Sequence, residues 1–216
     1  MPEHRQLKFT PPPGATTILL VRHGESMPVR EGEPVPLLGG ASNPELDPVG
    51  VEQAERVAAR LAGEDIAAIY VTPLQRTHQT AAPLAERLGL EPRVEPDLRE
   101  VFLGEWEGGA FRKHVREVHP TVVKMREQGR WDVIPGAEPA DEFAGRVRAG
   151  IERIAAAHPD ERVVAVVHGG VVGQAIANAT GASPLAFSWA DNGSITELVV
   201  HDGEWFVRSF NDVAHL

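Results

Sequence analysis

Three stretches of this 216-residue sequence place a cationic or imidazole side chain at the end of an apolar run or a few residues beyond it. The residues concerned are, in chain order, Arg22 and His23, then Thr72 with Arg76, and finally His168, Gly169 and Gly170. Arginine forks bind phosphoryl oxygens with permanent charge, and a helix N-terminus after the glycines would add backbone donors. A neutral imidazole can attack phosphorus, while a second, protonated imidazole can stabilise the oxygens as they move in line. These residue types therefore predict a covalent phosphoryl-transfer site, if the fold brings them together.

The apolar runs before these groups are predicted to be strands of one sheet. Residues 18–21, 66–71 and 163–167 are continuously apolar, which is typical of parallel strands covered on both faces. Helical patterns separate the runs, so we expect a mostly parallel sheet with right-handed crossovers. Ligands of such sheets bind beyond the carboxyl ends of the strands. The three stretches should therefore meet at one edge of the sheet.

Capping residues and turn signals predict the other elements. Asp47 before Pro48, and Thr72 before Pro73, each indicate the start of a helix. Near the end of the chain, Asp202-Gly203 between two strand-like runs is a strong hairpin signal. The predicted fold class is α/β, a three-layer α/β/α sandwich whose mostly parallel central sheet carries an antiparallel C-terminal edge hairpin.

The composition sets further limits. A chain that is 42% hydrophobic can bury one large core, so we expect one domain at 16–216 behind an N-terminal tail or arm at 1–15. A net charge of −10 argues against nucleic-acid and acidic-membrane partners, and the absence of cysteine excludes a thiolate nucleophile. No signal peptide or membrane span is evident, and the remaining histidines lack metal-ligand spacing. A cytoplasmic protein without a metal site is expected.

Four segments follow one another in the chain: LVRHGES at residues 20–26, PLQRTHQTA at 73–81, LREVFLGEWEG at 98–108 and VHGG at 167–170. In this order they resemble the motifs of the histidine phosphatase superfamily, of which the cofactor-dependent phosphoglycerate mutases are one branch. Any one of these segments is a modest signal. The ordered set is highly specific.

The resemblance implies a role for each matching residue. His23 takes the position of the phosphorylated nucleophile, and Arg22, Arg76 and His168 take those of the phosphate pocket. Glu100 takes the position of the proton donor. The residues alone predict only that a carboxyl group of raised pKa should protonate the leaving group. By themselves they do not select Glu100 among 31 acidic residues, and Glu25, Glu105 and Glu107 remain alternatives.

The sequence departs from the family at two places. Many members carry Asn at the position of Val29, where it helps to hold the phosphate, and the loop that follows is longer here. Arg30 or Asn43 is a candidate to compensate. Where relatives often read Gly-Gly-Glu-Ser before a helix, this chain has Gly-Ala-Glu-Pro at 136–139, which removes a serine N-cap.

Residues 109–135 are predicted to form a helical cap insertion. Between Arg112 and Arg130 cations outnumber acids, so Arg112 and Lys113 are candidates to attract an anionic substrate. A solvated helix face explains the same charges, and this alternative stays open.

The predicted function is a metal-independent phosphomonoester hydrolase that acts through phosphohistidine on a small phosphorylated metabolite, without a cofactor. Mutases of the family resemble Glu-Arg-His-Tyr-Gly after the proton donor, whereas Glu-Val-Phe-Leu-Gly stands at 100–104 here, which favours a phosphatase. A phosphoglycerate mutase is the first alternative, and a non-catalytic phosphate-binding or interaction module is the second. The sequence leaves the substrate and the oligomeric state open, with a homodimer as one option.

Overall fold

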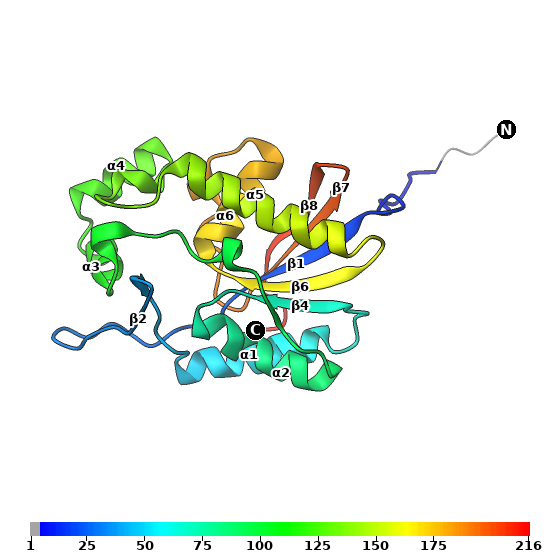
Figure 1. Cartoon of the computed structure of the whole chain (residues 1–216), viewed down its shortest axis with the longest axis horizontal. Helices are drawn as coiled ribbons and strands as arrows, with labels where there is room; N and C mark the ends of the chain where they lie inside the picture. The colour runs from blue at the N-terminus through cyan, green and yellow to red at the C-terminus, as the bar shows by residue number, and fades with distance from the viewer. Residues whose placement is uncertain (1–4) are drawn as a thin grey trace.

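Figure 1 shows the computed structural model of the chain, which describes residues 5–216. The main sheet contains β1 (Thr16–Arg22), β4 (Ala68–Val71), β5 (Arg93–Val94), β6 (Arg162–Val167), β7 (Ile195–His201) and β8 (Glu204–Asp212), and a separate hairpin pairs β2 (Leu37–Leu38) with β3 (Ala41–Ser42). The α-helices are α1 (Pro48–Leu61), α2 (Gln75–Leu88), α3 (Ala110–Arg116), α4 (Pro120–Gln128), α5 (Ala140–Ala157) and α6 (Gly169–Thr180). Short 3-10 helices are η1 (Pro96–Leu98), η2 (Gly104–Trp106), η3 (Trp131–Val133) and η4 (Pro184–Ala186).

The main sheet has the strand order β5-β4-β6-β1-β7-β8. The first four strands in this order pair in parallel, and β7 and β8 continue the sheet in antiparallel fashion. Helices α1 and α2 lie on one side of the sheet and α5 and α6 on the other, while α3, α4 and β2 lie beyond one end (Figure 1). The predicted three-layer α/β class with its antiparallel edge hairpin is confirmed.

Both faces of the central strands are buried, as their unbroken apolar runs predicted. In β1, Ile18 and Leu20 belong to the core under α5 and α6, whereas Leu19 and Val21 belong to the core under α1 and α2. Successive side chains of a strand point to opposite faces, so each face takes every second residue. The strand is thereby held on both sides, and its carboxyl end at Arg22 is fixed in position.

Two helix starts differ from the prediction. Helix α2 begins at Gln75 and not after Thr72, whose hydroxyl bonds His168 Nε2 at 2.9 Å and accepts from the Leu74 N–H at 3.3 Å. Asn43 Oδ1 accepts from the Gln75 N–H at 2.8 Å. At α5, Asp132 Oδ2 accepts from the Ala140 N–H at 3.1 Å. A carboxylate distant in sequence therefore replaces the serine cap that this chain lacks.

The described part of the predicted N-terminal arm lies against the sheet edge. The ring of Phe9 packs on Phe206 of β8 with centroids 5.9 Å apart, and the Arg208 guanidinium lies 3.9 Å from the Phe9 centroid. Residues 1–4 of this arm, including His4, lie outside the described residues. The division into an arm and a domain with a cap stays a prediction. Within residues 5–216, no helix has the length and apolar character required to traverse a bilayer.

Candidate active site

The groups predicted to meet at the carboxyl edge of the sheet do meet there. Arg22 ends β1 and His23 follows it, Arg76 lies in the first turn of α2 after β4, and His168 lies between β6 and α6. Arg76 Nε is 3.1 Å from His23 Nε2, and Arg76 Nη2 is 3.2 Å from His168 Nδ1. The two imidazole rings are 5.2 Å apart between centroids. Arg76 therefore joins both histidines in one buried cluster.

The hydrogen bonds of His23 determine its tautomer. Nδ1 lies 2.7 Å from the carbonyl oxygen of Gly24, which can only accept, so Nδ1 carries the proton. Nε2 then holds the lone pair and accepts from Arg76 Nε. Burial, together with the charges of Arg76 and Arg22, lowers the pKa of His23 well below 6.5. The ring is therefore neutral, with its free electron pair on Nε2.

The main chain around His23 is held by close packing. The carbonyl of His23 accepts from Asn192 Nδ2 at 2.8 Å, and the Gly24 N–H donates to Thr80 Oγ1 at 3.0 Å. A β-carbon at Gly24 would lie 2.4 Å from the carbonyl oxygen of Gly50 in α1. Only glycine allows this approach, so Gly24 brings the main chain beside His23 directly against helix α1.

His168 is neutral as well. Its Nδ1 faces the Arg76 guanidinium and so accepts, while Nε2–H donates to Thr72 Oγ1. Burial and the nearby Arg76 charge lower its pKa well below 6.5. The sequence predicted that the second imidazole would be protonated, whereas His168 is neutral in the structure. The positive charge beside His168 is supplied by Arg76 instead.

Arg22 and Gly169 pack together. The Arg22 guanidinium donates to the Ala190 carbonyl, and its buried Nε has no hydrogen-bond partner among the described residues. A β-carbon at Gly169 would lie 2.8 Å from the Ser188 carbonyl oxygen and 3.4 Å from Arg22 Nε. Gly169 does not line the cavity, so its placement does not support the predicted phosphate contact. Its small size leaves space for Arg22.

Glu100 lines the same cavity as His23. Its carboxylate accepts from the Val101 N–H at 2.9 Å and from the Gly170 N–H at 3.2 Å, so the α6 N-terminus donates to this acid. A β-carbon at Gly170 would lie 2.4 Å from Glu100 Oε1. Burial raises the pKa of Glu100, although these bonds and the arginines oppose the rise. The group is suited to hold a proton at mildly acidic pH.

A buried ion pair, which the sequence did not reveal, fixes the segment that carries Glu100. Arg146 of α5 bonds Glu138 through Nε and Nη2, at 2.5 and 2.8 Å. The same guanidinium donates to the carbonyls of Asp97, Arg99 and Glu100 at 2.6, 2.7 and 3.0 Å. Glu138 lies within the altered motif at 136–139, but nothing in the sequence indicates Arg146 as its partner. We call this arrangement the Arg146–Glu138 clamp.

Glu107 joins two other segments beside the cavity. Its carboxylate accepts from the backbone and hydroxyl of Ser42 and from the Leu103 N–H at 2.9 Å. Ser42 in turn offers its carbonyl to Arg76 Nη1 at 2.8 Å. Glu107 thus lines the cavity while its oxygens are occupied by neighbouring donors.

Of the four residues predicted to contact the substrate from loops, one lines the cavity and three do not. Arg112 lines the cavity and donates to the Ser26 hydroxyl at 2.7 Å and to the Met27 carbonyl at 2.9 Å. The other three predicted residues do not line it. Arg30 is exposed beside Glu33, and Lys113 is exposed 3.9 Å from Glu31. Asn43 caps α2, so its amide oxygen is committed to the Gln75 N–H.

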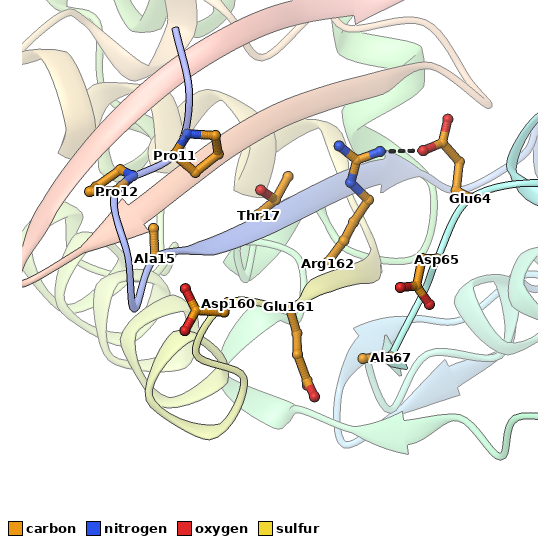
Figure 2. A pocket seen from close by; sticks show the side chains of 10 residues that line it. All are labelled: Pro11, Pro12, Ala15, Thr17, Glu64, Asp65, Ala67, Asp160, Glu161 and Arg162. Carbon is orange, nitrogen blue, oxygen red and sulfur yellow. Dashed lines mark hydrogen bonds and ion pairs between the residues drawn. The ribbon is translucent and has the colours of Figure 1, made fainter.

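The cavity at this edge has a volume of about 410 Å³. Its ionisable lining residues are Arg22, His23, Arg76, Glu100, Glu107, Arg112 and Arg116. A second cavity of about 470 Å³ lies at the opposite end of β1 and β6 (Figure 2). The one cation among its described lining residues, Arg162, is paired with Glu64, and the other charged lining residues are acidic. Of these two cavities, the first is the one suited to a phosphoryl group.

In the part of the chain that the structure describes, no group of three or more His, Asp or Glu is placed to hold a metal ion. The site instead offers two buried guanidinium groups. Burial lowers the pKa of Arg22, and it lowers that of Arg76 to about 10. The lowered pKa values reflect the free-energy cost of burying two charged guanidinium groups. A bound dianion would offset that cost, because it neutralises both cations.

Comparison with known proteins agrees with this site. Phosphoglycerate mutase-like protein 4 of Arabidopsis thaliana is 33% identical over 204 residues, which cover 92% of this chain and 86% of the relative. The metal-independent phosphoserine phosphatase of the same plant is 32% identical over 205 residues, 93% of this chain and 83% of the relative.

A solved structure shares the fold. The mycobacterial glucosyl-3-phosphoglycerate phosphatase superposes with a TM-score of 0.74 at 27% identity, over 91% of this chain and 99% of that one. The sequence model of the histidine phosphatase superfamily (branch 1) matches residues 18–213 of the chain. The predictions of family and of enzyme class are confirmed: the chain belongs to the histidine phosphatase superfamily, and it is a phosphatase.

Proposed function

We propose that this enzyme hydrolyses a small phosphate monoester through a phosphohistidine formed on Nε2 of His23, without a metal ion. The observation that carries the proposal is the unprotonated Nε2 of His23, held 3.1 Å from Arg76 Nε in a cavity that Glu100 also lines. A nucleophile, fixed cations and an acid of raised pKa are the groups that phosphoryl transfer to a side chain requires.

In the first step, the His23 Nε2 lone pair attacks phosphorus, and the bond from phosphorus to the ester oxygen breaks. The departing oxygen takes the proton of Glu100, so the alcohol leaves neutral and Glu100 becomes a carboxylate. Arg22 and Arg76 stabilise the three equatorial oxygens, and the unpartnered Nε–H of Arg22 is available to one of them. The positive charge that His23 acquires is balanced by the transferred dianion.

In the second step, a water molecule attacks the phosphorus of phosphohistidine while Glu100 takes one of its protons. The bond between Nε2 and phosphorus breaks, which restores neutral His23 and protonated Glu100 and releases inorganic phosphate. The Gly24 carbonyl continues to accept the hydrogen bond from Nδ1–H in both steps, so the ring keeps one orientation. The cycle therefore closes with protein groups alone.

The named phosphatase relatives support hydrolysis, whereas the first relative is named for its likeness to phosphoglycerate mutases. A mutase would use the same residues, but it must retain a bisphosphate during turnover. The Val-Phe-Leu-Gly segment at 101–104 in place of the mutase motif supports release of phosphate instead.

The experiment is phosphate release from an aryl phosphate and from a panel of phosphorylated metabolites, with and without 2,3-bisphosphoglycerate. We expect release that vanadate inhibits and that chelators leave unchanged. His23→Ala should abolish it, whereas His78→Ala, at an exposed histidine of α2, should not. Full activity of His23→Ala would overturn the mechanism. Transfer of the phosphoryl group from one position of the substrate to another, without net phosphate release and dependent on the bisphosphate, would establish the mutase instead.

A further inference from the structure

Beside its ionisable residues, the cavity that contains His23 has an apolar wall. It is built by Val29 and Val35 of the loop before β2, by Leu103, and by Phe111, Val115 and Trp131 of the cap region. The phosphoryl group occupies the side with His23, Arg22 and Arg76. The alcohol portion of a monoester must therefore extend toward this wall.

The wall is a packed structure in which the loop closes against the cap. A β-carbon at Gly109 would lie 2.6 Å from Val29 Cγ1 and 3.2 Å from Val35 Cγ2, so both valines contact the start of α3. The Phe111 ring lies 5.8 Å from that of Trp131 and 6.2 Å from that of Trp106. Val29, at the position where many relatives have Asn, thus serves as an apolar wall residue.

The Glu107 and Arg112 side chains, which also line the cavity, have partners already. The Glu107 carboxylate is held by Ser42 and Leu103, and the Arg112 guanidinium is held by Ser26 and Met27. An ammonium group of a substrate would find no uncommitted carboxylate here, because Glu100 is required as the acid. Arg116 lies at the exposed rim.

We infer that the substrate of this site is the phosphate monoester of an apolar alcohol or phenol, with a branched, ring-bearing or extended hydrocarbon group that fills the wall. The inference rests on the proposed function and adds the chemical class of the leaving group. A concave site lined mainly by apolar side chains, with a few convergent polar groups, binds ligands of that character. Amino-acid phosphates and phosphoglycerates would leave the wall unfilled.

The test is a series of straight-chain alkyl phosphates from methyl to hexyl. These esters have nearly equal leaving-group basicity, so their kcat/KM values report binding of the chain rather than reactivity. We expect kcat/KM to rise about fourfold for each methylene until the wall is filled, as for full burial of a CH₂ group. Phosphoserine and 3-phosphoglycerate should be on the order of 10³-fold poorer than hexyl phosphate, which is the product of five such gains.

A matched pair of variants locates the effect. Val29→Thr keeps the shape of the side chain but adds a hydroxyl to the wall, so the ratio of hexyl to methyl kcat/KM should fall about fivefold. Val123→Thr makes the same change on the outer surface of α4, where Val123 is 40% exposed, and should leave the ratio unchanged. Calorimetric binding of alkylphosphonates to the unaltered enzyme should show the same dependence on chain length without turnover.

The outcomes separate this inference from the proposed function. If no ester is hydrolysed and no phosphohistidine forms, the proposed function is wrong. If the esters are hydrolysed but kcat/KM is independent of chain length, or if phosphoserine or 3-phosphoglycerate exceeds hexyl phosphate, the proposed function stands and the apolar leaving group is overturned. An equal loss in Val29→Thr and Val123→Thr would also overturn it.

Discussion

Arg146→Met should separate the stability of the enzyme from the positioning of its acid. The Arg146 and Glu138 side chains are only 10% and 8% exposed, and the guanidinium also bonds three carbonyls of the segment that carries Glu100. Removing one partner of a buried ion pair leaves an uncompensated charge, which costs about 3–5 kcal/mol. For a domain of this size, the melting temperature should fall by roughly 2–4 °C for each kcal/mol.

The electrostatics of Glu138 give this prediction its direction. Burial raises the pKa of Glu138, but the hydrogen bonds and charge of Arg146 outweigh it, so the pKa lies below its ordinary value. Without Arg146 the carboxylate would be buried and partly unpaired. Glu138→Leu combined with Arg146→Met removes the unpaired charge, and most of the stability should return.

The catalytic consequence is measured with two substrates. A misplaced Glu100 cannot protonate a strongly basic alkoxide, so kcat/KM for ethyl phosphate should fall about 10²-fold in Arg146→Met. Hydrolysis of 4-nitrophenyl phosphate, whose leaving group departs without a proton, should fall by less than about tenfold. Both assays are run below the melting temperature of each variant.

The double variant decides whether Arg146 acts as a positioning residue. If it regains stability and also full activity on ethyl phosphate, the clamp has only a structural role and our reasoning about Glu100 is refuted. Equal losses on the two substrates would contradict it as well, because a misplaced acid must affect the poorer leaving group more.

Two further predictions concern the protonation and the partners of the site. Because burial and the arginines lower the pKa of His23 below 6.5 and burial raises that of Glu100 above 4.5, the acid limb of the kcat/KM profile should lie below pH 6.5 and the basic limb above pH 4.5. Glu100→Gln should remove the basic limb, and its survival in that variant would exclude Glu100 as the acid. Thr72→Val leaves His168 Nε2–H without its acceptor, which should cost about 1–3 kcal/mol in urea unfolding. An unchanged unfolding midpoint would mean that this hydrogen bond contributes nothing.

The positions of the cationic residues were predictable because each follows a buried strand. An apolar run without alternation predicts a strand covered on both faces, and parallel strands end at the same edge. Arg22, His23, Arg76 and His168 therefore came together as expected. Local signals at Asp47, which caps α1, and at the Asp202-Gly203 hairpin were also sufficient, since they depend on neighbouring residues alone.

Contacts between distant loops could not be predicted in the same way. Asn43 caps a helix that begins 32 residues later, and Arg146 reaches carbonyls up to 49 residues earlier. No periodicity links such residues, because irregular backbone decides where their side chains point. The hairpin of β2 and β3 was missed since its strands are two residues long. Arg30 was a candidate in the sequence but does not line the cavity, because it lies in irregular backbone whose course the sequence does not predict.

The atom that carries the phosphoryl group is the most direct test of the account. The enzyme, labelled with ¹⁵N-histidine, is mixed with substrate, quenched in alkali and analysed by NMR for phosphohistidine. Because Nδ1–H of His23 donates to Gly24 and Nε2 holds the lone pair, we predict a phosphoramidate at Nε2 of His23 alone, absent in His23→Ala. Phosphate on Nδ1, on another residue, or undiminished in His23→Ala would contradict the central claim.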